Sequence, residues 1–188
     1  MIIAMLNRLW MVRRIFARTL YALSLAAMLG PLASTWAESP SAARELSDPL
    51  VFIKAFDGDS LLLKNSRGKT VQVRLVGIDA PEKNQAHGLA ARERLESLLN
   101  AEEIEAKAVK RDGHGRWIAQ LSVGGKDIGQ TMILEGHAWY FRRYRTDLTV
   151  SARSRYEEAE AVAREERRGL WASDEEPIPP WRYREKRR

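Results

Sequence analysis

The sequence predicts a small β-barrel of the α+β class, because five short strand-like segments are interspersed with helical ones. Its length of 188 residues suits one domain, and a composition of 45% apolar and 30% charged residues is typical of a globular protein. The chain contains no cysteine, which excludes disulfides, thiolate nucleophiles and cysteine-ligated metal centres. Any metal site must therefore use oxygen or nitrogen ligands.

The first half of the predicted domain is a three-stranded meander. Apolar residues at 50–53 and 61–63 flank Asp57-Gly58-Asp59, and an Asp-Gly turn between such runs indicates a hairpin. A second turn at 65–68 leads into residues 69–76, in which apolar and polar side chains alternate. Two further strands are predicted later in the chain, at 104–109 and 117–123, joined by a glycine-rich loop at 112–115.

Three helices are predicted around these strands. The first covers 87–100, with Leu89, Leu95, Leu98 and Leu99 as its apolar stripe. The second begins after Asp127, which is a good capping residue, and ends at Glu135. The third covers about 150–168, and Gly169 is expected to end it.

The N-terminal segment has the pattern of a secretory signal peptide. Residues 1–37 contain four arginines and no acid, with an apolar run at 19–33 and small residues before a possible cleavage site after Ala37. The run is shorter than the roughly 20 apolar residues that span a bilayer. We therefore expect a periplasmic or secreted protein that meets the membrane only during export, with a retained inner-membrane anchor as the alternative. Residues 38–49 are expected to link this segment to a domain at 50–172.

The net charge of +6 is distributed unevenly along the chain. Residues 1–37 and the last ten residues each carry +4, whereas residues 38–178 have 22 basic and 24 acidic side chains. Overall charge is therefore no argument that the domain binds nucleic acid. The tail at 173–188, which is proline-containing and then basic, could contact phosphates, be disordered, or pack Trp181 on the domain.

Acidic side chains gather at two predicted turns. Asp57 and Asp59 lie two residues apart in the first turn, and Asp79 and Glu82 follow the third strand around Pro81. Asp59 and Asp79 offer the hard oxygen ligands that Ca²⁺ and Mg²⁺ prefer. Glu82 is a candidate general base.

Two arginines accompany these acids. Arg74 lies at the end of the third strand, and Arg116 follows the glycine-rich loop. The guanidinium fork matches phosphate oxygens, so a metal with two arginines would suit phosphodiester hydrolysis. Turn acids and surface arginines are the alternative interpretation, and residue types alone leave both open.

The order and spacing of these segments resemble the staphylococcal nuclease-like (thermonuclease) family, in an exported bacterial form. The similarity covers about residues 50–172. The segments that carry it are Asp57-Gly58-Asp59-Ser60, the run from Val73 to Glu82, Asp112-Gly113-His114-Gly115-Arg116, the run from Leu134 to Trp139, and Gly169-Leu170-Trp171. The resemblance implies a five-stranded OB-fold barrel with three α-helices.

The resemblance also implies a Ca²⁺-dependent nuclease that cleaves the P–O5′ bond of DNA and RNA and leaves 3′-phosphates. It makes Asp59 and Asp79 the carboxylate ligands of Ca²⁺, with the backbone carbonyl of Ala80 as a further ligand. Arg74 and Arg116 would bind the scissile phosphate and Glu82 would activate the attacking water.

Further substrate contacts are implied by three positions. Tyr144 matches one of the family's substrate-contacting tyrosines, Arg142 stands at the other, and His114 stands where an aromatic residue is common. Aromatic and arginine residues alternate at 139–145, which is typical either of a surface that binds single strands or of core packing beside a solvated face. We expect single-stranded or locally unpaired DNA and RNA as partners, no stable protein partner, and a monomer.

A non-catalytic nucleic-acid-binding or protein-interaction module on the same OB-fold is the alternative function. Such a module has no need of Arg74, Glu82 and Arg116 together with two metal-binding aspartates.

Overall fold

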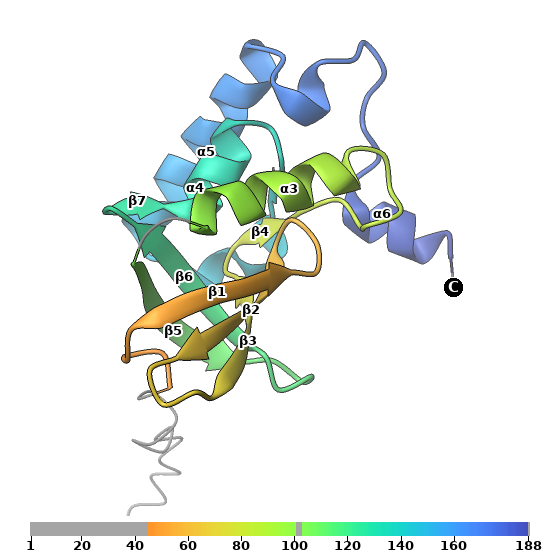
Figure 1. Cartoon of the computed structure of the whole chain (residues 1–188). Coiled ribbons are helices and arrows are strands. Elements are labelled where there is room, and N and C mark those ends of the chain that lie inside the picture. Colours follow the sequence, from red (N-terminus) through yellow and green to blue (C-terminus); the bar gives the residue numbers. More distant parts are fainter. Residues whose placement is uncertain (1–44, 101–102, 188) are drawn as a thin grey trace, which may run out of the picture. The chain divides into compact units, whose positions relative to one another are not determined.

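A computed structural model of the protein describes residues 45–100 and 103–187. The predicted signal segment at 1–37 lies outside the described residues. The main sheet of the described part contains the two-residue strand β7 (Lys126–Asp127) and five longer strands (Figure 1). The longer strands are β1 (Leu50–Ala55), β2 (Ser60–Asn65), β3 (Thr70–Leu75), β5 (Ile104–Arg111) and β6 (Trp117–Val123).

The sheet closes into a barrel, which confirms the predicted fold class. The order of the longer strands is β3-β2-β1-β5-β6 with antiparallel neighbours, and the first and last of these, β3 and β6, pair with each other in parallel. In that closing pair Val73 lies opposite Trp117 and Leu75 opposite Ala119. Closure removes the open edges of the sheet and brings the end of β3 beside the start of β6.

The alternating strand residues fill the barrel. On β3, Val71, Val73 and Leu75 are buried, and their polar neighbours along the strand face outward. Trp117 and Leu121 of β6 are fully buried against them. Burial of each such large apolar side chain contributes about 1.5–3 kcal/mol to folding.

Three α-helices gather at one end of the barrel (Figure 1). They are α3 (Gly88–Leu99), α4 (Ile128–Leu134) and α5 (Val150–Glu165). As predicted, Asp127 caps α4, since its carboxylate accepts a hydrogen bond from the Gln130 amide at 3.1 Å. The prediction for Leu89 is wrong: it is 57% exposed, whereas Leu95 and Leu99 bury the inner face of α3. The buried stripe of α3 consists of Gly88, Ala91, Leu95 and Leu99, and Leu89 lies one position away from it on the helix surface.

The end of α5 also differs from the prediction. The helix stops at Glu165, and Arg167 adopts a positive φ of 54°. The amide of Arg168 then donates to the carbonyl of Ala163, which closes the helix before Gly169 is reached. Gly169 instead begins the short 3-10 helix η2 (Gly169–Trp171).

Short elements connect these parts. They are β4 (Ile78–Asp79), which pairs with β8 (Trp139–Tyr140), β7 (Lys126–Asp127), which extends β6, and the 3-10 helix η1 (Arg142–Asp147).

Both ends of the described chain pack on the barrel. Residues 45–49 belong to the predicted linker, yet Leu46 is buried and Glu45 accepts a hydrogen bond from the indole nitrogen of Trp117. At the other end the tail forms a further helix, α6 (Pro180–Glu185), beside the loop that precedes α3 (Figure 1). Across residues 45–100 and 103–187, the longest helices are too short or too polar to cross a membrane.

Candidate active site

The site is built at the end of β3, where the chain turns into β4. Gly77 makes this turn with a positive φ of 73°, and a Cβ there would lie 2.5 Å from the side chain of Leu148. The tight turn places Asp79 on β4, where its backbone pairs with Trp139. The Asp79 side chain is completely buried.

The turn between β1 and β2 brings a second carboxylate to the same place. Asp57 holds this turn by accepting hydrogen bonds from the amides of Asp59 at 3.0 Å and Ser60 at 2.7 Å. Gly58 lets the turn approach the β4 loop closely, since a Cβ there would lie 2.7 Å from that of Ala80. Asp59 is consequently buried, and it accepts a hydrogen bond from the Ala80 amide at 3.0 Å.

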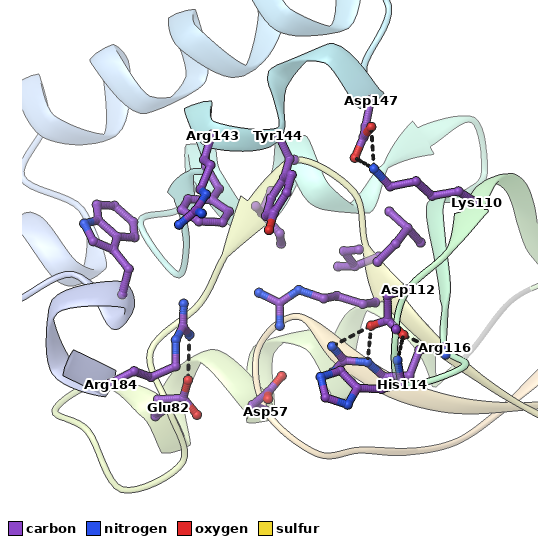
Figure 2. Close-up of a pocket in the computed structure, with 18 of the residues that line it drawn as sticks. Asp57, Glu82, Lys110, Asp112, His114, Arg116, Arg143, Tyr144, Asp147 and Arg184 are labelled. Atoms are coloured by element: carbon purple, nitrogen blue, oxygen red, sulfur yellow. Dashed lines mark hydrogen bonds and ion pairs between the residues drawn. The ribbon is translucent and has the colours of Figure 1, made fainter. Parts of the chain in front are cut away.

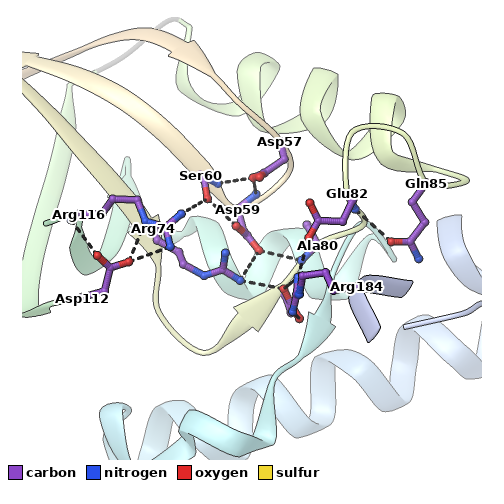
Figure 3. A network of polar contacts seen from close by, with 11 residues as sticks. Asp57, Asp59, Ser60, Arg74, Ala80, Glu82, Gln85, Asp112, Arg116 and Arg184 are labelled. Carbon is purple, nitrogen blue, oxygen red and sulfur yellow. Dashed lines mark hydrogen bonds and ion pairs between the residues drawn. The ribbon is translucent and has the colours of Figure 1, made fainter. Parts of the chain in front are cut away.

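Asp59 and Asp79 converge on Arg74, and Figure 3 shows Asp59 beside this arginine. The Nη2 atom of Arg74 lies 3.0 Å from Oδ2 of Asp59 and 2.8 Å from Oδ1 of Asp79. The hydroxyl of Ser60 donates to the other Asp59 oxygen at 2.8 Å. No role for Ser60 was predicted from the sequence, although this residue directly follows Asp59 in the motif.

The buried carboxyl groups of the site favour the binding of cations. Burial raises the pKa of Asp79, with hydrogen bonding from Arg184 opposing that rise. Burial and then the charge of Asp59 raise the pKa of Asp57 to about 7. The charge of Asp59 in turn raises the pKa of Arg74. Three carboxyl groups therefore compete for positive charge in a poorly hydrated space.

Glu82 lies on the loop after β4, with a side chain that is 36% exposed. Gln85 holds this loop, because its side-chain oxygen accepts a hydrogen bond from the Glu82 amide at 3.1 Å and its own amide donates to the Glu82 carbonyl at 2.8 Å. Glu82 is thus fixed at the backbone with a carboxylate that is partly exposed on the cleft, which suits a general base.

Arg116 is held by Asp112 on the opposite side of the site. Its Nε and Nη2 atoms both lie 2.8 Å from Oδ2 of Asp112 (Figure 3). The other Asp112 oxygen accepts from the amides of His114 and Arg116, each at 2.9 Å. Although burial raises the pKa of Asp112, these hydrogen bonds lower it below its ordinary value overall. Asp112 therefore orients the guanidinium of Arg116 and also holds the backbone of the loop between β5 and β6.

A third arginine, Arg184 of α6, joins the acidic cluster. Its guanidinium bridges Asp79 and Glu82, with contacts of 2.7 Å to each carboxylate. Arg184 lies outside the segments that carry the family resemblance. The basic character of the tail was its only signal in the sequence.

Several of these groups open onto one cleft of about 710 Å³, while the buried Asp59 and Asp79 are not among its lining residues (Figure 2). Arg74, Glu82, Arg116, His114 and Tyr144 all line it, so the structure brings together most of the predicted catalytic and substrate-binding side chains. The cleft is further lined by Asp57, Lys110, Asp112, Phe141, Arg143, Trp181 and Arg184. A groove with several cationic side chains and exposed aromatic edges is suited to a nucleic-acid strand.

Some of the residues at 139–145 pack in the core and others lie on the surface of the cleft. Trp139 and Tyr140 are buried, whereas Tyr144 is 48% exposed on the cleft wall. Arg142 turns away from the cleft, because it forms an ion pair with the buried Glu160 of α5 at 2.8 Å. Its partner was not predicted, since Glu160 occurs within a helix segment full of exposed acids.

The residues present fit a hard divalent cation. In the described ranges, no three acidic, histidine or cysteine side chains are grouped as a complete metal cage. Asp59 and Asp79 nevertheless direct carboxylate oxygens at the same Arg74 nitrogen, so two hard donors converge on one point. Ca²⁺ accepts roughly 6–8 oxygen ligands that include backbone carbonyls and water, so the Ala80 carbonyl and solvent would complete such a site.

Comparison with known proteins agrees with this geometry. A family model described as staphylococcal nuclease homologue matches residues 72–173. The chain belongs to the staphylococcal nuclease family. The matched range contains Arg74, Asp79, Glu82 and Arg116, while α6 lies beyond it.

Relatives in the staphylococcal nuclease family include proteins named as nucleases. The chain is 35% identical over 136 residues to an uncharacterized endonuclease of Escherichia coli O157:H7, covering 72% of this chain and 84% of the relative. It is 35% identical over 143 residues to a micrococcal nuclease of Shigella flexneri, covering 70% and 78%. Family membership and the assembled charged site support a nuclease function.

Proposed function

We propose that the protein is a Ca²⁺-dependent nuclease that hydrolyses phosphodiester bonds in DNA and RNA with little sequence preference. The observation that carries this proposal is the convergence of Asp59 and Asp79 beside Glu82, with Arg74 and Arg116 on the same cleft. Two buried aspartates that could hold a divalent cation, a partly exposed glutamate and two arginines supply each component that phosphodiester hydrolysis requires.

The bound Ca²⁺ would polarise the phosphate and supply positive charge as the transition state forms. Arg74 and Arg116 bind the phosphate oxygens and offset the additional negative charge. Glu82 takes a proton from the attacking water as its oxygen bonds to phosphorus. The P–O5′ bond breaks, the departing 5′ oxygen takes a proton from solvent water, and a 3′-phosphate end remains.

Unpaired strands are the proposed substrates, and the protein acts as a monomer. Tyr144 offers an exposed ring on the cleft wall, and such a ring stacks on a base only when that base is free of its duplex neighbours. The charged rim of the cleft provides phosphate contacts without reading base edges, which supports low sequence preference.

Digestion assays test this function. Plasmid DNA and RNA are incubated with the wild type, Glu82→Ala or Arg74→Ala, in Ca²⁺ or in EDTA. We expect cleavage in Ca²⁺ only, and a loss of at least about 100-fold in both variants. Glu93→Ala, at an exposed position of α3, is the matched acidic control and should retain activity.

Two results would redirect the proposal. Equal activity of the wild type and Arg74→Ala would remove the catalytic assignment. Binding of single-stranded DNA without cleavage in any divalent metal would favour the non-catalytic OB-fold module instead.

We also propose that the protein is exported, on the basis of the signal-like pattern at 1–37. The N-terminus of protein recovered from the periplasm or medium should begin at Glu38 or a near neighbour. An intact residue 1 in membrane fractions would identify an anchor instead.

A further inference from the structure

The C-terminal helix α6 packs in a defined position at the rim of the cleft. Trp181 stacks on Phe141 with ring centroids 5.4 Å apart and an angle of 22°, and it meets Trp139 edge-on at 6.2 Å. The hydroxyl of Tyr183 donates to the carbonyl of Asn84 at 3.1 Å. These contacts hold α6 against the loop that carries Glu82.

The position of α6 places Arg184 in contact with the carboxylates of Asp79 and Glu82. Its Nη2 lies 2.7 Å from Oδ2 of Asp79, and its Nη1 lies 3.2 Å from Oδ1 of Asp79 and 2.7 Å from Oε1 of Glu82 (Figure 3). The first pair of bonds is the bidentate fork that arginine forms with carboxylates. One side chain therefore engages both oxygens of a proposed metal ligand and an oxygen of the proposed general base.

We propose that Arg184 competes with the metal ion for Asp79, so that α6 sets the metal concentration at which the enzyme becomes active. This inference rests on the proposed function. With Arg184 in place, Asp79 has both oxygens committed and Glu82 is engaged, so the site holds neither the metal nor a free base. Binding of a divalent cation at Asp79 displaces the guanidinium and releases Glu82 in the same step.

The charge of the cluster explains why such a counter-ion is useful. Asp79 is fully buried, so its carboxylate is poorly stabilised unless cations surround it, and Arg74 and Arg184 are cationic side chains that contact it. Arg184, whose side chain is 39% exposed, supplies one positive charge and can withdraw to solvent. Competition is reciprocal, so removing the arginine must strengthen metal binding.

The experiment measures Ca²⁺ binding to the full-length chain by titration calorimetry. The variants are Arg184→Gln, Arg182→Gln, and a chain that ends at Ile178. Arg182 is exposed on the same helix and carries the same charge, but it is not among the residues that line the cleft. It therefore controls for a general effect of charge, and the shortened chain controls for any distortion caused by glutamine.

We expect Arg184→Gln to bind Ca²⁺ about tenfold more tightly than the wild type, a difference of about 1.4 kcal/mol. The shortened chain should bind at least as tightly as Arg184→Gln, and Arg182→Gln should stay within about twofold of the wild type. The Ca²⁺ concentration for half-maximal cleavage should move in parallel.

The possible failures are distinct. Equal or weaker Ca²⁺ binding by Arg184→Gln would overturn the competition and leave the proposed function in place. An identical gain in Arg182→Gln would reduce the effect to general charge and also overturn it. If no variant binds Ca²⁺, the metal assignment of the proposed function fails together with this inference.

Discussion

The imidazole rings of His87 and His137 stack on each other, with centroids 5.0 Å apart and Nε2 of His87 3.1 Å from Nδ1 of His137. His87 precedes α3 with a positive φ of 68°, and His137 follows α4, so the pair joins two helices. Burial and then the positive charge of His87 lower the pKa of His137 to about 4. The folded protein therefore keeps His137 neutral at pH values where an unfolded chain protonates it.

This pair predicts a loss of stability in mild acid. Between pH 6.5 and about 4 the unfolded state binds more protons at His137 than the folded state, so the free energy of unfolding falls as pH falls through this range. Allowing for partial exposure, the loss is roughly 1–2 kcal/mol. Urea denaturation at pH 7 and pH 4.5 measures it. His137→Gln should show a smaller loss than the wild type, while His114→Gln should match the wild type; equal losses in all three would contradict the prediction.

Asp112 is predicted to act by positioning Arg116. Asp112→Ala removes both hydrogen bonds to the guanidinium, so kcat should fall about 10- to 100-fold while KM changes little. Asp112→Asn retains an acceptor oxygen and should recover part of kcat. Steady-state kinetics on single-stranded DNA provides both constants. A change confined to KM would indicate a role in substrate binding instead.

Gly58 is predicted to be irreplaceable for steric reasons. In Gly58→Ala the new Cβ would lie 2.7 Å from the Cβ of Ala80 and 2.8 Å from that of Ala91, so the turn must move away from β4. We expect destabilisation of about 1–3 kcal/mol and loss of metal affinity as Asp59 shifts. Gly113→Ala is the matched control, because a Cβ there has no neighbour within 4 Å. Thermal unfolding that treats the two variants alike would refute this.

Tyr144 is predicted to bind a base through its ring. Tyr144→Ala should raise KM for single-stranded DNA about tenfold, since stacking on an aromatic ring contributes about 1–3 kcal/mol per base. Tyr144→Phe keeps the ring and should stay near the wild type. Duplex DNA should respond less to either change, and equal KM values for Tyr144→Ala and the wild type would exclude the stacking role.

Much of the fold was predictable because strand alternation and capping are local signals. The burial of Val71, Val73 and Leu75 follows from their alternation along the strand. The start of α4 follows from Asp127, a residue type that favours the N-cap position of a helix. Leu89 and the end of α5 were not predictable in this way. Solvent exposure in a first helical turn depends on where the barrel lies, and Arg167 adopts the left-handed conformation that favours glycine.

The residues of the site likewise fall into those that could be predicted from the sequence and those that could not. The roles of five charged residues were implied by the resemblance to the family, because a family motif records a tertiary arrangement indirectly. The partners of Arg184 and Arg142 could not be named, since Asp79 and Glu160 reach them only through the packing of α6 and α5. Such pairings depend on where α5 and α6 pack in the folded protein, and the local sequence of each helix does not indicate that position.

The parallel pairing of β3 with β6 has a kinetic consequence. Arg74 belongs to β3 and Arg116 directly precedes β6, so the two arginines face one substrate only after Val73 and Trp117 have become neighbours. Contacts between strands so distant along the chain form slowly, after local hairpins. During refolding, recovery of cleavage should therefore lag behind recovery of secondary structure. A newly synthesised chain would therefore have no nuclease activity until β3 and β6 have paired.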